Sequence, residues 1–250
     1  MSDTLQEAAS VTDNGSFNPI RRIGWAVAVC FLLGYIAVPA IAQLIPAQDE
    51  FLLFRQTVEC SGPLVALLVL LAILRCRSGS WRGVAAMLDW HGVKTAAAVK
   101  LLLTAPLIAL AAGGITLLWQ LGAAYCNIEM ALPPTTALMQ NGSWLQVFML
   151  ALTALTAAPV LEEIIFRRTL FGLLKEYIGS WGAGAASAAV FGAMHMSLLQ
   201  LPGLMFMAAI WQVMYLWKKN LCCSILLHWG NNMIAVAMLL AGRYLGILDL

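Results

Sequence analysis

Charged residues are scarce in this chain. Only 10% of its 250 residues are Asp, Glu, Lys or Arg, whereas 62% are hydrophobic, and the mean hydropathy is +0.85. A soluble domain of this size needs far more polar surface. The composition therefore excludes a soluble globular protein and indicates an integral membrane protein. The Lys and Arg residues are spread among predicted helix ends, so the net charge of +2 predicts no nucleic-acid partner.

Metal-binding cysteine patterns and a secretion signal are also absent. The six cysteines show no CxxC or CxxH spacing, so we expect ordinary thiols, with a Cys60–Cys126 pair as the less favoured alternative. Residues 1–20 have neither a basic start nor an apolar core. They are predicted to form a disordered cytoplasmic tail rather than a cleaved signal.

Long apolar runs fill most of the remaining chain. Runs of membrane-spanning character predict an all-α, polytopic transmembrane helical bundle of about seven spans. The runs cover about residues 24–45, 61–74, 97–124, 144–178, 181–199, 201–217 and 221–240. Residues 49–59 are predicted to be a polar loop, and 81–93 an interfacial segment with two tryptophans at headgroup level.

Basic residues alternate between the ends of these runs. They gather before the first run, between the second and third, after the fourth and after the sixth. The positive-inside rule then predicts a cytoplasmic N-terminus and, with seven spans, a C-terminus outside the cell. We expect the protein to reside in a bacterial inner (plasma) membrane.

Two adjacent carboxylates, Glu162 and Glu163, interrupt the fourth run. An ionisable side chain at the bilayer centre costs about 2.5–3.5 kcal/mol, so it usually marks a pathway or a catalytic centre. Glu163 and Arg167 are four residues apart and predict a structural ion pair. Glu162 points about 100° away around the helix, which leaves it available for chemistry. Arg167 and Arg168 are expected to snorkel to the interface.

Histidine occurs only three times. His91 lies in the predicted interfacial segment and is interpreted as an ordinary surface histidine. His195 and His228 lie inside apolar runs. A turn predicted near Gly179 would bring His195 level with Glu162 in an antiparallel hairpin, with His228 at a similar depth.

These residue types can perform hydrolysis together if water reaches them. A carboxylate hydrogen-bonded to a neutral histidine can act as general base toward a water molecule. His228 and Asn232, one helical turn apart, could donate to the oxyanion of a tetrahedral intermediate. The alternative is that each polar residue only forms an interhelical hydrogen bond worth about 0.6 kcal/mol. For one residue that is equally plausible, but five at one depth favour function.

Three motifs resemble the CAAX protease and bacteriocin-processing (Abi) family of intramembrane proteases. They are Glu162-Glu163 with Arg167, Phe191 with His195, and His228 with Asn232. The resemblance covers about residues 143–240. It divides the chain into the tail, 21–142 as N-terminal transmembrane helices, and 143–250 as the catalytic core.

The resemblance implies an α-helical membrane endopeptidase acting on a protein or peptide substrate in the bilayer. Glu162 and His195 would activate water, and His228 and Asn232 would stabilise the oxyanion. Glu163, Arg167 and Phe191 would support them. Relatives trim prenylated proteins or process peptides, and the resemblance does not choose among these substrates.

Other interpretations remain open. Two histidines and a carboxylate, here Glu162, His195 and His228, can hold catalytic zinc. The chain lacks HExxH and Asn232 is a poor zinc ligand, so a metal-free glutamate mechanism without a cofactor is favoured. A transporter or proton relay would be expected to show two related halves, and no internal repeat is visible. A haem protein ligated by His195 and His228 and a catalytically silent scaffold are further alternatives.

Overall fold

The computed structural model describes residues 19–46 and 48–246, so the predicted tail lies outside the described residues except for its last two positions. The predicted all-α class is confirmed, since the described residues form helices and no strands. Two π-helical turns, η1 and η2, interrupt the α-helices. The elements are α2 (Pro19–Leu32), η1 (Leu33–Ala37), α3 (Val38–Gln43), α4 (Asp49–Ser78), α5 (Trp81–Met87), α6 (Thr95–Tyr125), α7 (Pro134–Asn141), α8 (Trp144–Leu155), α9 (Ala157–Glu163), η2 (Ile164–Leu170), α10 (Phe171–Met194), α11 (Leu201–Lys218) and α12 (Leu221–Tyr244).

About seven membrane crossings are consistent with these helices. Within the described ranges, 5 helical stretches are long and apolar enough to span a bilayer. One of them, Trp144–Met194, is 51 residues long and turns at Gly179, where φ is 70° and ψ is 174°. Only glycine adopts such a backbone readily, so the predicted turn is confirmed and this stretch makes two crossings. The 18-residue α11 is not among these 5 stretches, but it packs against α6 and α10, and counting it gives the seven predicted crossings.

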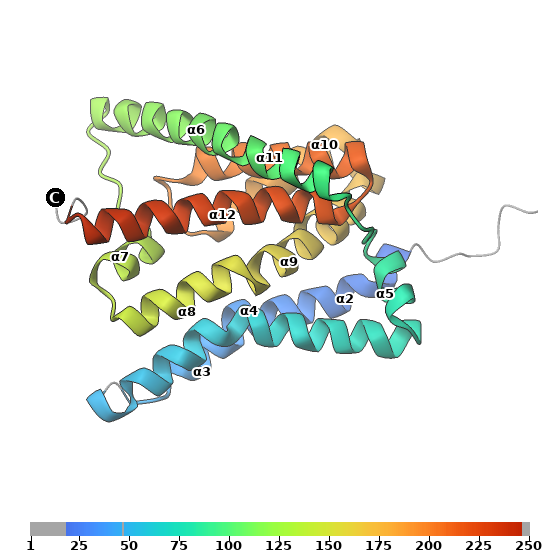
Figure 1. Ribbon diagram of the computed structural model, residues 1–250, viewed down its shortest axis with the longest axis horizontal. Helices are drawn as coiled ribbons and strands as arrows, with labels where there is room; N and C mark the ends of the chain where they lie inside the picture. Colours follow the sequence, from blue (N-terminus) through green and yellow to red (C-terminus); the bar gives the residue numbers. More distant parts are fainter. Residues whose placement is uncertain (1–18, 47, 247–250) are drawn as a thin grey trace, which may run out of the picture.

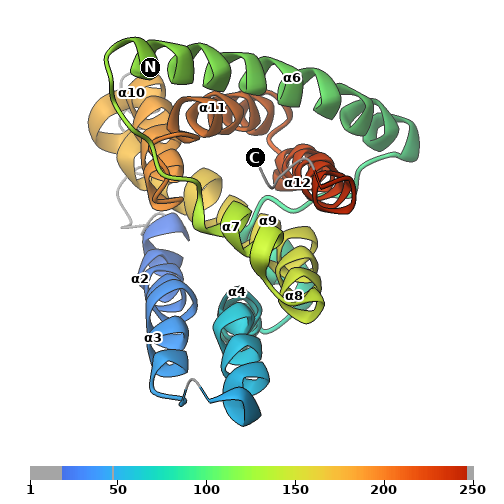
Figure 2. The same ribbon diagram turned by 90° about the vertical axis from the view of Figure 1, so that its left-hand side faces the viewer.

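The helices form two groups joined by a central segment. In Figure 2, the hairpin of α2, α3 and α4 lies apart from the layer that contains α6, α10, α11 and α12. The helix pair α8 and α9 runs between them (Figures 1 and 2), where α4 packs on both and α12 packs on α9. The segment with the two carboxylates is therefore the place where the N-terminal and C-terminal helices meet.

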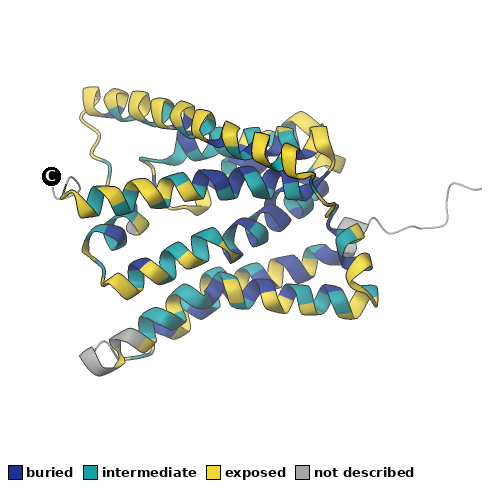
Figure 3. Ribbon diagram, in the orientation of Figure 1, coloured by how far each residue is buried: buried dark blue, intermediate teal, exposed yellow. Residues whose placement is uncertain are grey.

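The outer surface is apolar, as a bilayer requires. Exposed residues follow the outer side of α6 (Figure 3), while most of η2 is buried where it packs against α2, α10 and α12. Leu103, Leu107, Leu110 and Leu118 of α6 are all more than two-thirds exposed. Such a stripe would be costly in water but is suited to lipid.

Two predicted boundaries are wrong. Residues 49–59 are not a loop, since α4 begins at Asp49. A continuous helix satisfies the hydrogen bonds of backbone N–H and C=O groups near a bilayer. This gain outweighs the preference of the scattered charged residues for a loop. The run from Trp144 is not continuous, since α8 ends before Thr156 at φ −127° and ψ −82°. Pro159 has no N–H for the carbonyl of Leu155, so the helical ladder fails there.

The first helix approaches α4 closely through glycine. A Cβ on Gly34 would lie 2.6 Å from the Cβ of Ala66 and 2.8 Å from the carbonyl oxygen of Gly62. Small residues permit this contact in membranes. The η1 turn has a local cause. Pro39 offers no N–H to the carbonyl of Tyr35, and the N–H of Val38 donates to the carbonyl of Leu33, five residues earlier.

Cys60 and Cys126 are free thiols, so the alternative disulfide is not formed.

Candidate functional site

A buried ion pair forms the base of the site. Arg167 Nε lies 3.2 Å from Glu163 Oε2, and the two side chains are 1% and 0% exposed. The predicted i,i+4 pair is therefore confirmed. Burying either charge alone would be expensive, so the pair makes the fold depend on both partners.

Arg167 does not snorkel, contrary to prediction. Its Nη2 donates to the carbonyl of Ala208 at 3.1 Å, and its guanidinium carbon lies 4.9 Å from the ring centroid of Phe191 and 5.2 Å from that of Trp211. The carboxylate, the carbonyl and the aromatic faces together replace water around the cation. The depth of this residue is set by these partners rather than by its distance from the helix end.

His228 joins this pair from α12. Its Nδ1 lies 3.0 Å from Glu163 Oε1, and its ring stacks on Trp211 at 4.1 Å with an interplanar angle of 15°. Glu163 is ionised beside Arg167 and can only accept, so Nδ1 carries the hydrogen. The second nitrogen, Nε2, is thereby turned toward Glu162.

Glu162 occupies a different environment from Glu163. Its side chain is 12% exposed, and Oε2 lies 3.6 Å from His228 Nε2. That separation is too long for a hydrogen bond. The other oxygen, Oε1, accepts a hydrogen bond of 2.9 Å from the hydroxyl of Tyr35. Glu162 is thus oriented on one side and faces an imidazole nitrogen on the other.

Tyr35 was missed by sequence reasoning. It lies in η1, 127 residues before Glu162, and its ring stacks on Phe31 at 5.1 Å. A tyrosine inside an apolar run is a weak signal, because its ring alone suits a membrane helix. The proline four residues later, which produces the π-helical turn, is the local feature that could have drawn attention to it.

His195 lies on the other side of an aromatic ring. Phe191 is 1% exposed, and its centroid is 4.8 Å from that of His195 and 5.8 Å from that of His228. His195 Nδ1 lies 2.8 Å from the carbonyl oxygen of Phe191. A carbonyl only accepts, so Nδ1 is the donor and Nε2 is left for other partners. Phe191 thus separates the two histidines, and His195 is exposed rather than in contact with Glu162.

Asn232 has a structural partner that the sequence did not reveal. Its Nδ2 donates to the carbonyl of Ala154 at 2.8 Å, and Trp229 Nε1 donates to that of Leu155 at 2.9 Å. These are the carbonyls released where α8 breaks before Pro159. Together the two side chains of α12 replace the missing ladder bonds, while one N–H of Asn232 remains for another acceptor.

Asn231, the neighbour of Asn232, is also part of the helix packing. Its Oδ1 accepts from Trp211 Nε1 at 3.2 Å, and its Nδ2 donates to the carbonyl of Ala105 at 2.9 Å. These bonds hold the indole on which His228 stacks. Asn231 therefore acts on the site through Trp211.

The alternative zinc ligands do not assemble here. In the part of the chain that the structure describes, no three His, Cys, Asp or Glu side chains lie close enough to hold a metal ion. Glu162 and His228 face each other, but the ring of Phe191 lies between His195 and His228. The side-chain arrangement does not fit a zinc centre made of Glu162, His195 and His228.

Comparison with known proteins supports a peptidase relationship for the C-terminal part of the chain. Residues 143–234 match the family model described as type II CAAX prenyl endopeptidase Rce1-like. Over 80 residues the chain is 35% identical to a Bacillus subtilis (strain 168) protein named "Putative membrane peptidase YdiL". The aligned part is 32% of this chain and 33% of the relative, so the chain spans about a third of the curated relative that it matches. No solved structure matches. The resemblance that the three motifs predicted is thereby confirmed for residues 143–234, which are similar to the CAAX prenyl endopeptidase family.

Proposed function

We propose that this protein is an intramembrane endopeptidase that hydrolyses a peptide bond of a membrane-associated or lipidated protein or peptide. The observation that carries the proposal is the setting of Glu162, which is held by Tyr35 and faces His228 within a membrane-embedded polar cluster. The family of residues 143–234 supports the reaction class.

Glu162 is the general base in the proposed reaction. It takes a proton from a bound water molecule as the water oxygen attacks the substrate carbonyl carbon. The C–N bond then breaks, and the same proton passes to the leaving amine. His195, through Nε2, takes part in binding and activating this water from the exposed side of the site.

His228 and Asn232 are the proposed oxyanion donors. His228 in its protonated form offers Nε2–H, and Asn232 offers the N–H that Ala154 does not use. Losing one such donor commonly lowers the rate about 10²–10³-fold. Glu163 and Arg167 are positioning residues. Glu163 holds the ring of His228 through Nδ1, and Arg167 holds Glu163.

The proposed mechanism uses no metal, and a zinc site made of Glu162, His195 and His228 is the alternative. We place the protein in a bacterial inner membrane with its basic loops in the cytoplasm. The substrate enters from the lipid or from the cytoplasmic side.

Glu162→Gln is the direct test. Membrane peptides and proteins of cells that express the wild type would be compared with those of cells that express Glu162→Gln. Glu129→Gln makes the same change at an exposed loop carboxylate. Cleavage products should be present with the wild type and Glu129→Gln and absent with Glu162→Gln, while all three proteins melt alike. Equal products from Glu162→Gln would refute the assignment.

A chelator separates the glutamate mechanism from the zinc mechanism. The purified protein should cleave a substrate found in that comparison equally well before and after treatment with EDTA. Loss of cleavage that added zinc restores would overturn the metal-free proposal but leave the peptidase assignment intact.

A further inference from the structure

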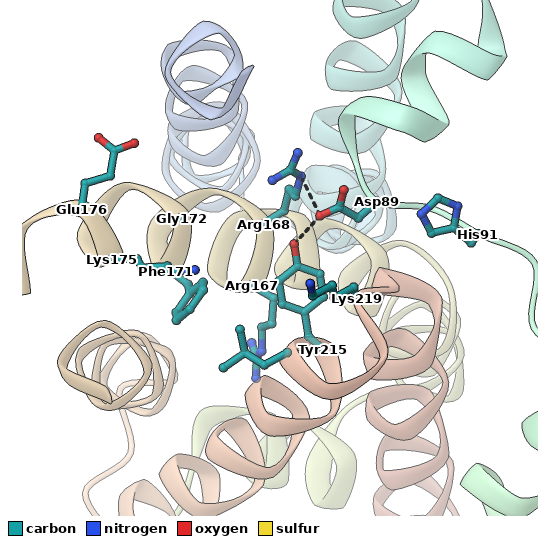
Figure 4. Close-up of a pocket in the computed structure, with 11 residues that line it drawn as sticks. Asp89, His91, Arg167, Arg168, Phe171, Gly172, Lys175, Glu176, Tyr215 and Lys219 are labelled. Atoms are coloured by element: carbon teal, nitrogen blue, oxygen red, sulfur yellow. Dashed lines mark hydrogen bonds and ion pairs between the residues drawn. The ribbon is translucent and has the colours of Figure 1, made fainter. Parts of the chain in front are cut away.

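A pocket lies beside the Glu163–Arg167 ion pair, at the end of the bundle where basic residues gather. It has a volume of about 590 Å³, within the range of small-molecule sites. Figure 4 shows its lining side chains on three separated parts of the chain: the loop after α5, the end of η2 with the start of α10, and the end of α11. The lining residues are Asp89, His91, Arg167, Arg168, Phe171, Gly172, Lys175, Glu176, Tyr215, Leu216 and Lys219. We call it the basic pocket.

The pocket is suited to a negative ligand. Four of its side chains are cationic and two are carboxylates. One carboxylate, Asp89, is already engaged, since Oδ2 lies 3.5 Å from Arg168 Nε and accepts 2.6 Å from Tyr215 OH. These contacts are visible in Figure 4. Lys175 and Lys219 are exposed at the mouth of the pocket, and they leave its field positive.

Arg167 provides the second indication. It is 1% exposed, yet its Nη1 has no hydrogen-bond partner among the described residues. An unsatisfied buried donor costs about 1–3 kcal/mol, more when it is charged. Nε faces Glu163 Oε2 in the ion pair without a hydrogen bond, and Nη2 donates to the carbonyl of Ala208. Nη1 of this pocket-lining guanidinium has neither kind of partner among the described residues. A ligand oxygen in the pocket would satisfy it.

The position in the membrane suggests where that oxygen comes from. Lys219 follows α11, whose last two residues are Trp217 and Lys218, and Lys218 Nζ lies 3.6 Å from the centroid of the Trp217 ring. Exposed tryptophan and lysine of this kind mark the headgroup level. Phe171 and Leu216 provide an apolar wall beside the charges. Basic pockets between transmembrane helices on the cytoplasmic side are suited to anionic headgroups.

We propose that the basic pocket binds a phosphate group carried by the headgroup of an anionic membrane lipid. Arg167 Nη1 meets one phosphate oxygen, and Lys175 and Lys219 attract the headgroup at the mouth. The proposal does not depend on peptidase activity, because binding can be measured without a substrate.

Binding would be measured on the full chain in neutral detergent. Dihexanoyl phosphatidylglycerol is titrated while heat release and melting temperature are followed, with dihexanoyl phosphatidylcholine as the zwitterionic comparison. The test variant is Lys175→Gln with Lys219→Gln. The matched control is Lys100→Gln with Lys218→Gln, which removes the same charge from exposed lysines outside the lining.

The anionic lipid should raise the melting temperature of the wild type and of the control, and the zwitterionic lipid should not. The pocket variant should bind about tenfold or more weakly, since each lysine near the headgroups contributes measurably. It should still melt like the wild type without lipid. Equal affinities for the pocket and control variants would overturn the proposal.

Two competitors distinguish the sources of the anion. Inorganic phosphate that displaces the lipid at equal concentration would assign the pocket to a soluble phosphate compound instead of a lipid. A short peptide with a free C-terminus that displaces it, and an amidated copy that does not, would assign the pocket to a substrate carboxylate and overturn the lipid proposal.

Discussion

Glu162 and Glu163 are neighbours in the sequence, but they lie in opposite environments. Glu163 belongs to a closed side, made with Arg167, Phe191 and Trp211, where every side chain is buried. Glu162 belongs to an open side, made with Tyr35, where both side chains are partly exposed. His228 contacts both carboxylates. The difference indicates that the closed side holds the ring in place while the open side meets water and substrate.

Breaking the closed side should have the largest effect on stability. Arg167→Leu leaves Glu163 buried without its cation, which should cost about 3–5 kcal/mol. Thermal unfolding in detergent would measure this loss. Glu163→Gln combined with Arg167→Leu should recover part of it, because no lone charge remains. A wild-type melting temperature for Arg167→Leu would contradict the structural importance of the pair.

A similar difference between a structural and a catalytic role can be tested on α12. Trp229 and Asn232 each satisfy a carbonyl at the break after α8. Asn232→Ala should lower the free energy of unfolding by about 1–2 kcal/mol. Trp229→Phe removes the equivalent bond and should cost a similar amount.

Activity separates the two roles of Asn232. If Asn232 also binds the oxyanion, Asn232→Ala should lose about 10²-fold in rate at a temperature where it is fully folded. Trp229→Phe should keep most of its activity under the same conditions. Equal activities in the two variants would restrict Asn232 to a structural role.

Local sequence rules were sufficient where a partner lies within one helical turn. Hydropathy predicted most helices, the i,i+4 spacing predicted the Glu163–Arg167 pair, and Gly179 predicted the hairpin turn. Each of these depends on the residues nearby and on the properties of a bilayer. The same rules separated Glu162 from Glu163 by their directions around one helix.

The other features depend on contacts between distant segments. The depth of Arg167 is set by Ala208, Phe191 and Trp211 on other helices, so counting residues from the interface misplaced it. The break before Pro159 had a visible cause, but the continuous apolar pattern outweighed it. The separation of His195 from His228 depends on the packing of Phe191 of α10 against His228 of α12, which no spacing rule supplies.

Tyr35 offers the most selective way to perturb the open side. Tyr35→Phe removes one hydroxyl and leaves the ring stacked on Phe31. Glu162 loses the donor that orients Oε1, so we expect the rate to fall about tenfold, as for one hydrogen bond to a charged group. The fall should appear in kcat rather than in KM, because the hydroxyl orients the carboxylate and does not bind the substrate.

Tyr215→Phe is the matched control for this change. It deletes the same atom from a tyrosine that donates to Asp89, outside the proposed catalytic group. Its kcat and KM should remain those of the wild type, even if it melts slightly earlier. A purely structural role for Tyr35 would lower the melting temperature and leave the kcat of the folded protein unchanged. A lower kcat at unchanged stability would instead show that the N-terminal helices, which lie outside the matched residues 143–234, contribute directly to the chemistry of the site.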